Sequence, residues 1–207
     1  MNYKVINTGS DGNATIIEGS ILIDCGVSFK KIKPHLNDLK LVLLTHIHTD
    51  HFKKSTVKKL AHERPTLRFG CCEWLVQELI KCGVNKRNID VYDFNTKYTY
   101  NSKLAIETVE LYHDVPNCGY RLFINDNKVI YMTDTRTLDE ISAIDYDLYL
   151  VEANYENEEE LHKRAQNEYY ESRVKYTHLS KEYTINWLLN NMGDSSKYVF
   201  MHQHKER

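Results

Sequence analysis

The sequence predicts a layered domain of mixed strands and helices, the α/β class, from three features of its pattern. Short apolar segments rich in β-branched residues occur in both halves of the chain. Segments with a helical spacing of apolar residues lie between them, and clusters of Gly, Asn, Asp and Ser separate the two kinds. The connections are short, which favours this class over a helical bundle or an all-β sandwich.

The first half of the chain begins with short strands and continues with two helices. Strands are predicted at 3–6, 14–17, 21–24 and 41–45. The last of these is almost entirely apolar, which is typical of a strand buried on both faces. Helices are predicted at 52–63, closed by Pro65, and at 73–81, ended by Gly83. The apolar stripe of the second helix consists of Trp74, Leu75, Val76, Leu79 and Ile80.

The second half contains strands and helices in a similar mixture. Strands are predicted at 104–111, 120–124, 128–132, 147–151 and 197–201, with a hairpin turn at 125–127. A charged helix is predicted at 156–173. A further helix at 180–191 has Ser180 as its N-cap and Gly193 just past its end.

Length and composition predict one globular domain over residues 1–207. No apolar run approaches the ~18 residues of a membrane span, and no signal-peptide core follows the N-terminus. The five cysteines are odd in number and form no CxxC pair, which argues for reduced thiols and against a four-cysteine zinc site. We therefore expect a cytoplasmic protein with no membrane partner.

The segment His46-Ile47-His48-Thr49-Asp50-His51 directly follows the buried strand and holds four side chains that can bind a metal ion. The alternation of an extended chain places His46 and His48 on the same side. Asp50 and His51 lie where the chain turns into a helix, and they can face a second ion about 3.5–4 Å away. Chance histidines in a polar turn are the alternative, but the position after a buried strand favours a metal site.

Three later strands also end on residues that bind metals. His113 follows the strand at 104–111, Asp134 follows the strand at 128–132, and His202 follows the strand at 197–201. A site built along one edge of a sheet would produce this pattern. Each residue taken singly also fits an ordinary surface turn.

This set of residues resembles the ligand pattern of the dinuclear metallo-β-lactamase superfamily. The resemblance implies an αββα sandwich with two divalent ions at the sheet edge. It assigns His46, His48 and His113 to one ion, Asp50, His51 and His202 to the other, and Asp134 to both. Zinc suits His and Asp ligands, and a site with carboxylates also accepts manganese.

Further motifs resemble the YycJ/WalJ-type exonucleases in order along nearly the whole chain. These are TGSDGNAT at 8–15, LIDCGVS at 22–28, EANYE at 152–156 beside that family's ESNHD, and HLS at 178–180 beside its GHLSN. Tyr155 replaces the histidine of ESNHD, and Thr177 replaces the glycine before HLS. The resemblance implies a metal-dependent phosphodiesterase that cleaves nucleic acid, as a DNA exonuclease, by means of a metal-bridged hydroxide.

The resemblance also implies roles for individual residues. Asp50 would orient the nucleophile, and His178 would protonate the leaving oxygen or contact a phosphate. The alternative is that His178 is the last metal ligand and His202 a tail residue. Asp24 and Glu152, each at a strand end, would orient ligands without binding the metal themselves.

Substrate contacts are expected from residues near these motifs, namely Ser10, Asn13, Asn154, Lys53 and Lys54. Residues 1–100 carry 15 Lys and Arg against 10 Asp and Glu, a net charge of +5, whereas residues 101–207 carry 12 against 19, a net charge of −7. The basic run Lys53, Lys54, Lys58, Lys59, Arg64 and Arg68 fits a track for a polyanion, and it fits equally the solvent face of a helix. The overall charge of −2 excludes a protein that binds nucleic acid by bulk charge.

Two other functions stay open. A hydrolase of small molecules on the same fold, either a phosphodiesterase for cyclic nucleotides or other small diesters or a lactonase, would use the same metals. A metal-stabilised interaction module would instead saturate the ions with protein ligands. Dimers are common in the superfamily, so a homodimer is compatible with the resemblance.

Overall fold

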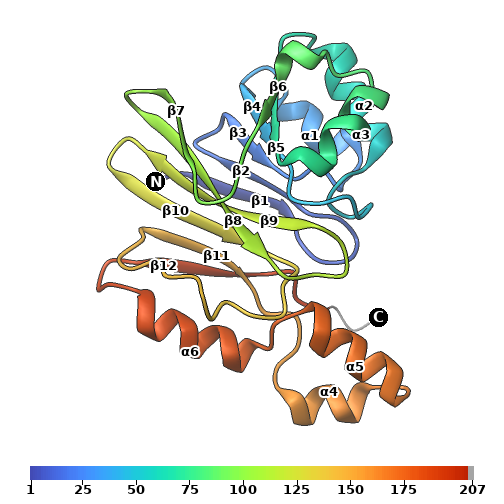
Figure 1. The fold of residues 1–207 in the computed structure, drawn as a ribbon, viewed down its shortest axis with the longest axis vertical. Coiled ribbons are helices and arrows are strands. Elements are labelled where there is room, and N and C mark those ends of the chain that lie inside the picture. Colours follow the sequence, from blue (N-terminus) through green and yellow to red (C-terminus); the bar gives the residue numbers. More distant parts are fainter. Residues whose placement is uncertain (205–207) are drawn as a thin grey trace. The chain divides into compact units, whose positions relative to one another are not determined.

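The computed structural model describes residues 1–204 and divides into two compact units, with the boundary between Asp93 and Phe94 (Figure 1). Each unit contains one six-stranded sheet and its own helices. No helix among the described residues is both long and apolar enough to cross a lipid bilayer. The expectation of a single domain over 1–207 stays a prediction.

The sheet of the first unit follows the order of the chain, from β1 to β6. Its strands are β1 (Tyr3–Asn7), β2 (Ala14–Ile17), β3 (Ile21–Ile23), β4 (Leu41–Leu43), β5 (Arg68–Cys71) and β6 (Ile89–Val91). The first three strands are antiparallel, and β3 to β6 are parallel. Strand β4 is therefore central and fully buried, as its apolar sequence predicts.

The helices of the first unit are short. They are α1 (Phe29–Ile32), α2 (Lys54–Glu63) and α3 (Val76–Lys81), with 3₁₀ turns η1 (Lys33–His35), η2 (Glu73–Leu75) and η3 (Lys86–Asn88). The predicted apolar stripe of the second helix is correct for Leu75, Val76 and Leu79, which are buried, but wrong for Ile80, which is exposed. Strands β5 and β6 are absent from our predictions. Both are short, with four and three residues, and neither shows a clear alternation of apolar and polar residues.

The sheet of the second unit has the order β12-β11-β10-β9-β8-β7. Its strands are β7 (Lys97–Asn101), β8 (Leu104–Leu111), β9 (Asn117–Ile124), β10 (Asn127–Met132), β11 (Leu148–Glu152) and β12 (Lys197–Met201). Strands β7 to β10 are antiparallel, and β10, β11 and β12 are parallel. The predicted hairpin turn joins β9 to β10, and Asn125 adopts the left-handed conformation there with φ 53°.

Three helices belong to the second unit: α4 (Glu158–Arg164), α5 (Glu168–Thr177) and α6 (Lys181–Asn191). The single helix predicted at 156–173 is wrong, because Asn157 and Asn167 each cap a separate helix with their side chains. The prediction for α6 is confirmed, and the Ser180 side chain accepts a hydrogen bond from the Tyr183 amide. Figure 1 shows α4 and α5 together beyond the end of the sheet, whereas α6 runs along it.

Candidate metal centre

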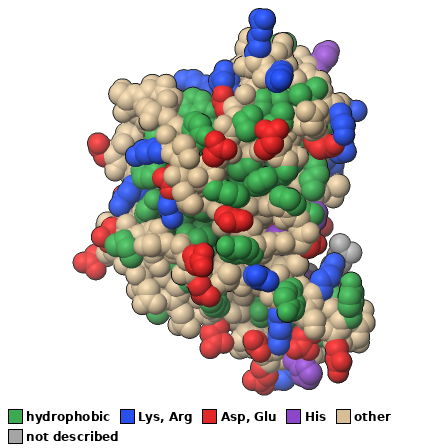
Figure 2. Space-filling model, in the orientation of Figure 1, with side chains coloured by type: hydrophobic (Ala, Val, Ile, Leu, Met, Phe, Trp, Pro, Cys, Tyr) green, Lys and Arg blue, Asp and Glu red, His purple; other side chains and the backbone are tan. Residues whose placement is uncertain are grey.

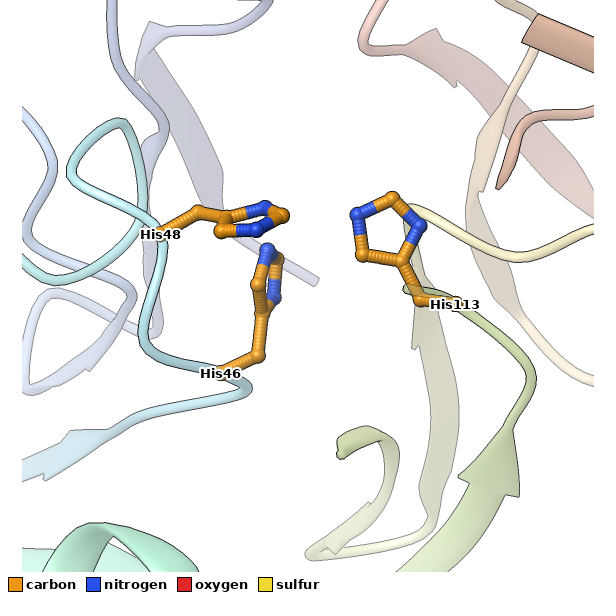
Figure 3. Close-up of side chains that lie close together, drawn as sticks. All are labelled: His46, His48 and His113. Carbon is orange, nitrogen blue, oxygen red and sulfur yellow. The ribbon is translucent and has the colours of Figure 1, made fainter. Parts of the chain in front are cut away.

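The loop after β4 gathers four of the predicted site residues in the first unit. Leaving the central strand, the chain brings the ring centroid of His46 within 4.9 Å of that of His48 and within 4.2 Å of that of His51. Figure 3 shows the His46 and His48 side chains on this loop. The Nε2 atom of His51 lies 3.7 Å from a carboxylate oxygen of Asp50. Three imidazoles and one carboxylate are thus concentrated in one turn of chain, as the HxHxDH spacing predicts.

Asp24, the residue after β3, holds this loop from behind. It is fully buried and adopts φ 59°, a left-handed conformation. Its carboxylate accepts hydrogen bonds from the amide and the hydroxyl of Thr45, both at 3.0 Å, and lies 2.7 Å from Nδ1 of His51. Donation by Nδ1–H to this carboxylate fixes the imidazole tautomer and leaves Nε2 as the basic nitrogen.

The N-terminal loop packs against the same residues. The Asn13 amide donates to the Asp50 carbonyl at 2.6 Å, and the Asn13 side-chain nitrogen lies 2.8 Å from Nε2 of His51. Asn13 is fully buried, whereas Ser10 is exposed. A role in substrate binding stays a prediction for both residues. In the described chain, Asn13 supports the loop that carries Asp50 and His51.

A second cluster lies within the second unit. Asp134, Glu152, His178 and His202 each offer one ligand atom, and these atoms all lie within 4.8 Å of one another. Asp134, Glu152 and His202 come at or just after the ends of β10, β11 and β12, which are parallel and in register, so their carboxyl ends meet at one edge. His178 joins them from the connection between α5 and α6. Asp134 and His202 adopt left-handed backbone angles, with φ 60° and 50°.

Glu152 organises this cluster. One of its carboxylate oxygens lies 2.6 Å from Nδ1 of His178 and 3.2 Å from Nδ1 of His202. The other oxygen accepts hydrogen bonds from the amides of Thr135 and Leu179, both at 3.2 Å. Burial alone would raise the pKa of Glu152, but the charge of His178 and the hydrogen bonds from both histidines hold this pKa below its usual value. Glu152 is thus an ionised acceptor that fixes two imidazoles.

His113 follows β8 in the same unit and is drawn in Figure 3. Its Nδ1 lies 3.0 Å from the carbonyl oxygen of Thr177. Its Nε2 lies 3.1 Å from a carboxylate oxygen of Asp114 and 4.0 Å from one of Asp134. Burial lowers the pKa of His113, an effect that the two carboxylates partly oppose. Donation from Nδ1 to the carbonyl leaves Nε2 as the nitrogen that faces the two carboxylates, of which Asp114 is the nearer.

The structure divides the predicted basic track into two kinds of residue. Arg64 donates to the carbonyls of Leu36 and Leu39, and Arg68 pairs with Asp90, so both arginines brace the first unit. Lys54 pairs with Glu78 at 2.7 Å. Lys53, Lys58 and Lys59 are exposed, and the Nζ atom of Lys59 lies 5.8 Å from the centroid of the Phe29 ring. Asn154 is half-buried, and its side-chain amide donates to the His202 carbonyl at 3.1 Å.

Sequence reasoning missed Asn117 in this region, and it gave only part of the role of Glu152. Asn117 donates its side-chain amide to the carbonyls of Thr133 and Asp134, at 2.9 and 2.7 Å, and so holds the turn that carries Asp134. Glu152 was expected to orient ligands, but its place among the ligand atoms of three other residues was not expected. Neither role has a local signal, because both depend on strands that are distant in the sequence.

Comparison with known proteins agrees with this geometry. The family model described as "Beta-lactamase superfamily domain" matches residues 20–202. The chain is 27% identical over 232 residues to a protein named exodeoxyribonuclease WalJ from Streptococcus pneumoniae, covering 99% of this chain and 82% of that protein. Among solved structures, it resembles the metallo-β-lactamase fold protein YhfI from Bacillus subtilis, with a TM-score of 0.74 and 16% identity over 99% of this chain and 87% of YhfI.

Another solved structure, the short form of human tRNase Z, gives a TM-score of 0.72 and 14% identity, covering 98% of this chain and 93% of the enzyme. The similarities to both solved structures establish the fold, so the predicted fold class is confirmed. The imidazole and carboxylate donors of the two clusters suit a divalent metal. This chain belongs to the β-lactamase superfamily and is a metal-dependent hydrolase of the metallo-β-lactamase fold.

Proposed function

We propose that the chain hydrolyses the phosphodiester bonds of nucleic acid, as a DNA exonuclease. The observation that carries this proposal is that each unit has its own group of donors. The loop after β4 holds three imidazoles and the Asp50 carboxylate, and the second unit holds Asp134, Glu152, His178 and His202. The similarity to a protein named exodeoxyribonuclease WalJ over 99% of this chain supports DNA as the substrate. The motifs at 8–15, 152–156 and 178–180 support the same choice.

The proposal includes two divalent ions, zinc or manganese, as cofactors. As the family resemblance implies, His46, His48 and His113 would hold one ion, Asp50, His51 and His202 the other, and Asp134 both. The donor chemistry fits, because imidazoles and carboxylates in this proportion suit either metal. When bound, two such ions activate a water molecule and stabilise the charge that develops on the phosphoryl oxygens.

The side chains of the chain supply the remaining steps. Asp50, with its partly exposed carboxylate, orients the attacking water and accepts its proton. His178 gives its proton to the leaving oxygen through Nε2, since Glu152 occupies Nδ1. Glu152 therefore sets the orientation of the acid without touching the substrate. Asp24 does the same for His51 in the other unit.

The test is nucleotide release from end-labelled linear duplex DNA by protein reconstituted with manganese and, separately, with zinc. Asp50→Ala should abolish release and leave the circular dichroism spectrum unchanged, because the core strands do not depend on this side chain. Asp38→Ala, at an exposed acid outside the motifs, is the matched control and should keep full activity. Release that persists in Asp50→Ala would contradict the proposed mechanism.

One observation favours a second candidate, the hydrolysis of small diesters. Arg64, Arg68 and Lys54 all have partners within the first unit, so less of the predicted basic track is available to a long polyanion. A protein that holds its metals and cleaves bis(p-nitrophenyl) phosphate or a cyclic nucleotide, but releases nothing from DNA, would establish this alternative. Hydrolysis of a lactone by the same metal-loaded protein would test the alternative that the chain is a lactonase.

The cytoplasmic location and the homodimer also stay proposals. A nuclease that acts on cellular DNA would work in the cytoplasm, which fractionation of the source cells would test. Light scattering of the purified protein would distinguish a monomer from a dimer.

A further inference from the structure

Helix α5 exposes a stripe of two tyrosines and one arginine. Tyr169, Arg173 and Tyr176 are spaced by four and three residues, so they lie on one face of the helix. Tyr169 is 79% exposed and Tyr176 67%, among the highest values for large apolar side chains in the described chain. Arg173 is also exposed, and within residues 1–204 its guanidinium forms no ion pair or hydrogen bond. We call these three residues the α5 stripe.

The opposite face of α5 explains why the stripe points outward. Val174 and Thr177 are buried, and Val174 packs in a small apolar cluster with Tyr155, Leu161 and Tyr170. This cluster and the Asn167 cap fix the rotation of the helix. The outward position of the stripe is thus a result of packing rather than of fraying at a helix end.

The charges around the stripe are mixed: Glu158, Glu159 and Glu160 begin the neighbouring helix α4, and Arg173 supplies the positive charge within the stripe. Glu171 pairs with Lys175 at 3.0 Å and with His162 at 2.9 Å, so this carboxylate is neutralised within the helical pair. Glu168, at the exposed start of α5, is the remaining acid of the helix. Figure 2 shows basic, acidic and hydrophobic side chains mixed over the α4 and α5 region. The stripe itself combines two aromatic rings with one positive charge.

The stripe ends at a cavity beside the candidate metal centre. This cavity of about 580 Å³ is lined by Tyr176 and Thr177 of α5 together with Tyr112, His113 and Arg136. The exposed Arg136 has its guanidinium carbon 5.5 Å from the centroid of the Tyr112 ring. Glu110 and Asp114 are the acidic residues of the lining. The path along α5 therefore leads from Tyr169 through Tyr176 to His113, a proposed metal ligand.

We propose that the α5 stripe binds a single-stranded segment of nucleic acid and guides it to the metal centre. Bases stack on Tyr169 and Tyr176, and Arg173 contacts the phosphate between them. Seven residues of helix separate the two rings by about 10.5 Å along the axis. This separation is about three times the 3.4 Å spacing of stacked bases, so only a strand whose bases are splayed apart can use both rings. The inference rests on the proposed nuclease function and specifies the form of its substrate.

The experiment measures binding of a fluorescent single-stranded DNA oligonucleotide by anisotropy, in EDTA so that no cleavage occurs. Tyr169→Ala and Tyr176→Ala should each raise the Kd about fivefold to twentyfold, because each removes one stacking platform. Tyr169→Phe and Tyr176→Phe keep the ring and should bind within about twofold of the unchanged protein. Arg173→Gln should reduce the slope of log Kd against log salt by about 0.7, the value for one phosphate contact on a single strand.

Tyr198→Ala is the matched control, because Tyr198 is a 51% exposed tyrosine on β12, outside the stripe. It should leave the Kd unchanged. Steady-state kinetics on a longer single strand should show that Tyr169→Ala raises KM more than it lowers kcat. A blunt duplex of the same length should bind more weakly than the single strand.

The outcomes separate this inference from the proposed function. If the protein releases nucleotides but the stripe variants bind single strands as tightly as the unchanged protein, the proposed role of the α5 stripe is wrong and the nuclease proposal stands. If binding of single strands depends on the two rings but the protein cleaves no DNA, the proposed role of the α5 stripe is supported and the nuclease proposal is contradicted. The proposed role of the α5 stripe is also wrong if the protein does not bind single strands, or if Tyr198→Ala lowers the affinity as much as the stripe variants do.

Discussion

The carboxylate of Asp24 lies 2.7 Å from Nδ1 of His51, and both side chains are fully buried. The two residues are 27 positions apart in sequence and come from the ends of β3 and the loop after β4, which are neighbours in a parallel pair. A buried carboxylate on Nδ1 sets the ring orientation and raises the basicity of Nε2. The strand pairing of the first unit therefore determines the direction of a predicted ligand.

Asp24→Asn should weaken metal binding and stability together. The amide replaces a carboxyl group that accepts from the Thr45 amide and contacts His51, so we expect a metal affinity about 10- to 100-fold lower and an unfolding free energy about 1–3 kcal/mol lower. Metal analysis after dialysis and urea denaturation measure the two effects. Asp11→Asn, on the exposed N-terminal loop, should change neither. Full metal content in Asp24→Asn would contradict the role of Asp24.

Gly26→Ala should displace the loop that carries Asp50 and His51. A Cβ atom at this position would overlap the carbonyl oxygen of Asp50 and approach the amide of His51, and backbone atoms cannot move aside as a side chain can. We expect a loss of about 1–3 kcal/mol in unfolding free energy and reduced metal content.

Gly19→Asn serves as the control for Gly26→Ala. No atom lies within 4 Å of a Cβ at Gly19, and asparagine tolerates its left-handed φ of 65°. Denaturation curves of the two variants should therefore differ. Coincident curves would show that the loop accommodates the additional methyl group.

His178→Ala and His202→Ala should distinguish an acid from a ligand. With Nδ1 held by Glu152, the proposed role of His178 is that of proton donor, so its removal should keep both proposed ions and lower kcat about 10²- to 10⁴-fold. His202→Ala should lose one ion. The measurement is metal content per chain beside turnover, with the 87% exposed His62 changed to alanine as the control. If His178→Ala loses one ion and His202→Ala keeps both, His178 is the metal ligand.

Glu78 should make stability depend on pH in the acid range. Hydrogen bonds from Lys54 and Lys81 lower the pKa of this carboxyl from 4.5 to about 2. Because the folded state favours the ionised form, the pairing stabilises the fold above pH 4.5, and this contribution is lost as the pH falls toward 2. The Tm difference between the unchanged protein and Glu78→Gln should therefore shrink between pH 5 and pH 3.

The control for Glu78 is Glu73→Gln, at an exposed acid of the preceding turn. Its Tm difference should not follow the same course with pH. High salt should also reduce the effect of Glu78→Gln at neutral pH, because exposed ion pairs are screened. A Tm difference that is constant from pH 7 to pH 3 would show that the two lysines do not stabilise the ionised form.

Much of the candidate site could be predicted from the chain alone. The HxHxDH segment follows a run of apolar residues, and His113, Asp134 and His202 each follow another strand, so periodicity and position were sufficient to single them out. Short apolar strands with turn residues between them were equally visible. The division of 156–173 into two helices does not follow from periodicity, because the caps at Asn157 and Asn167 lie within a largely polar segment.

What the sequence by itself determined is the α/β class and the identity of most candidate ligands, since both follow from local patterns of hydrophobicity and residue type. Only the tertiary structure decided which carboxylate supports which imidazole: Asp24 for His51, and Glu152 for both His178 and His202. It also decided that Arg64 and Arg68 brace the first unit and that Tyr169 and Tyr176 face outward. The physical reason is that hydrogen-bond partners and exposure depend on strand pairing and helix rotation, which bring together residues 22 to 50 positions apart.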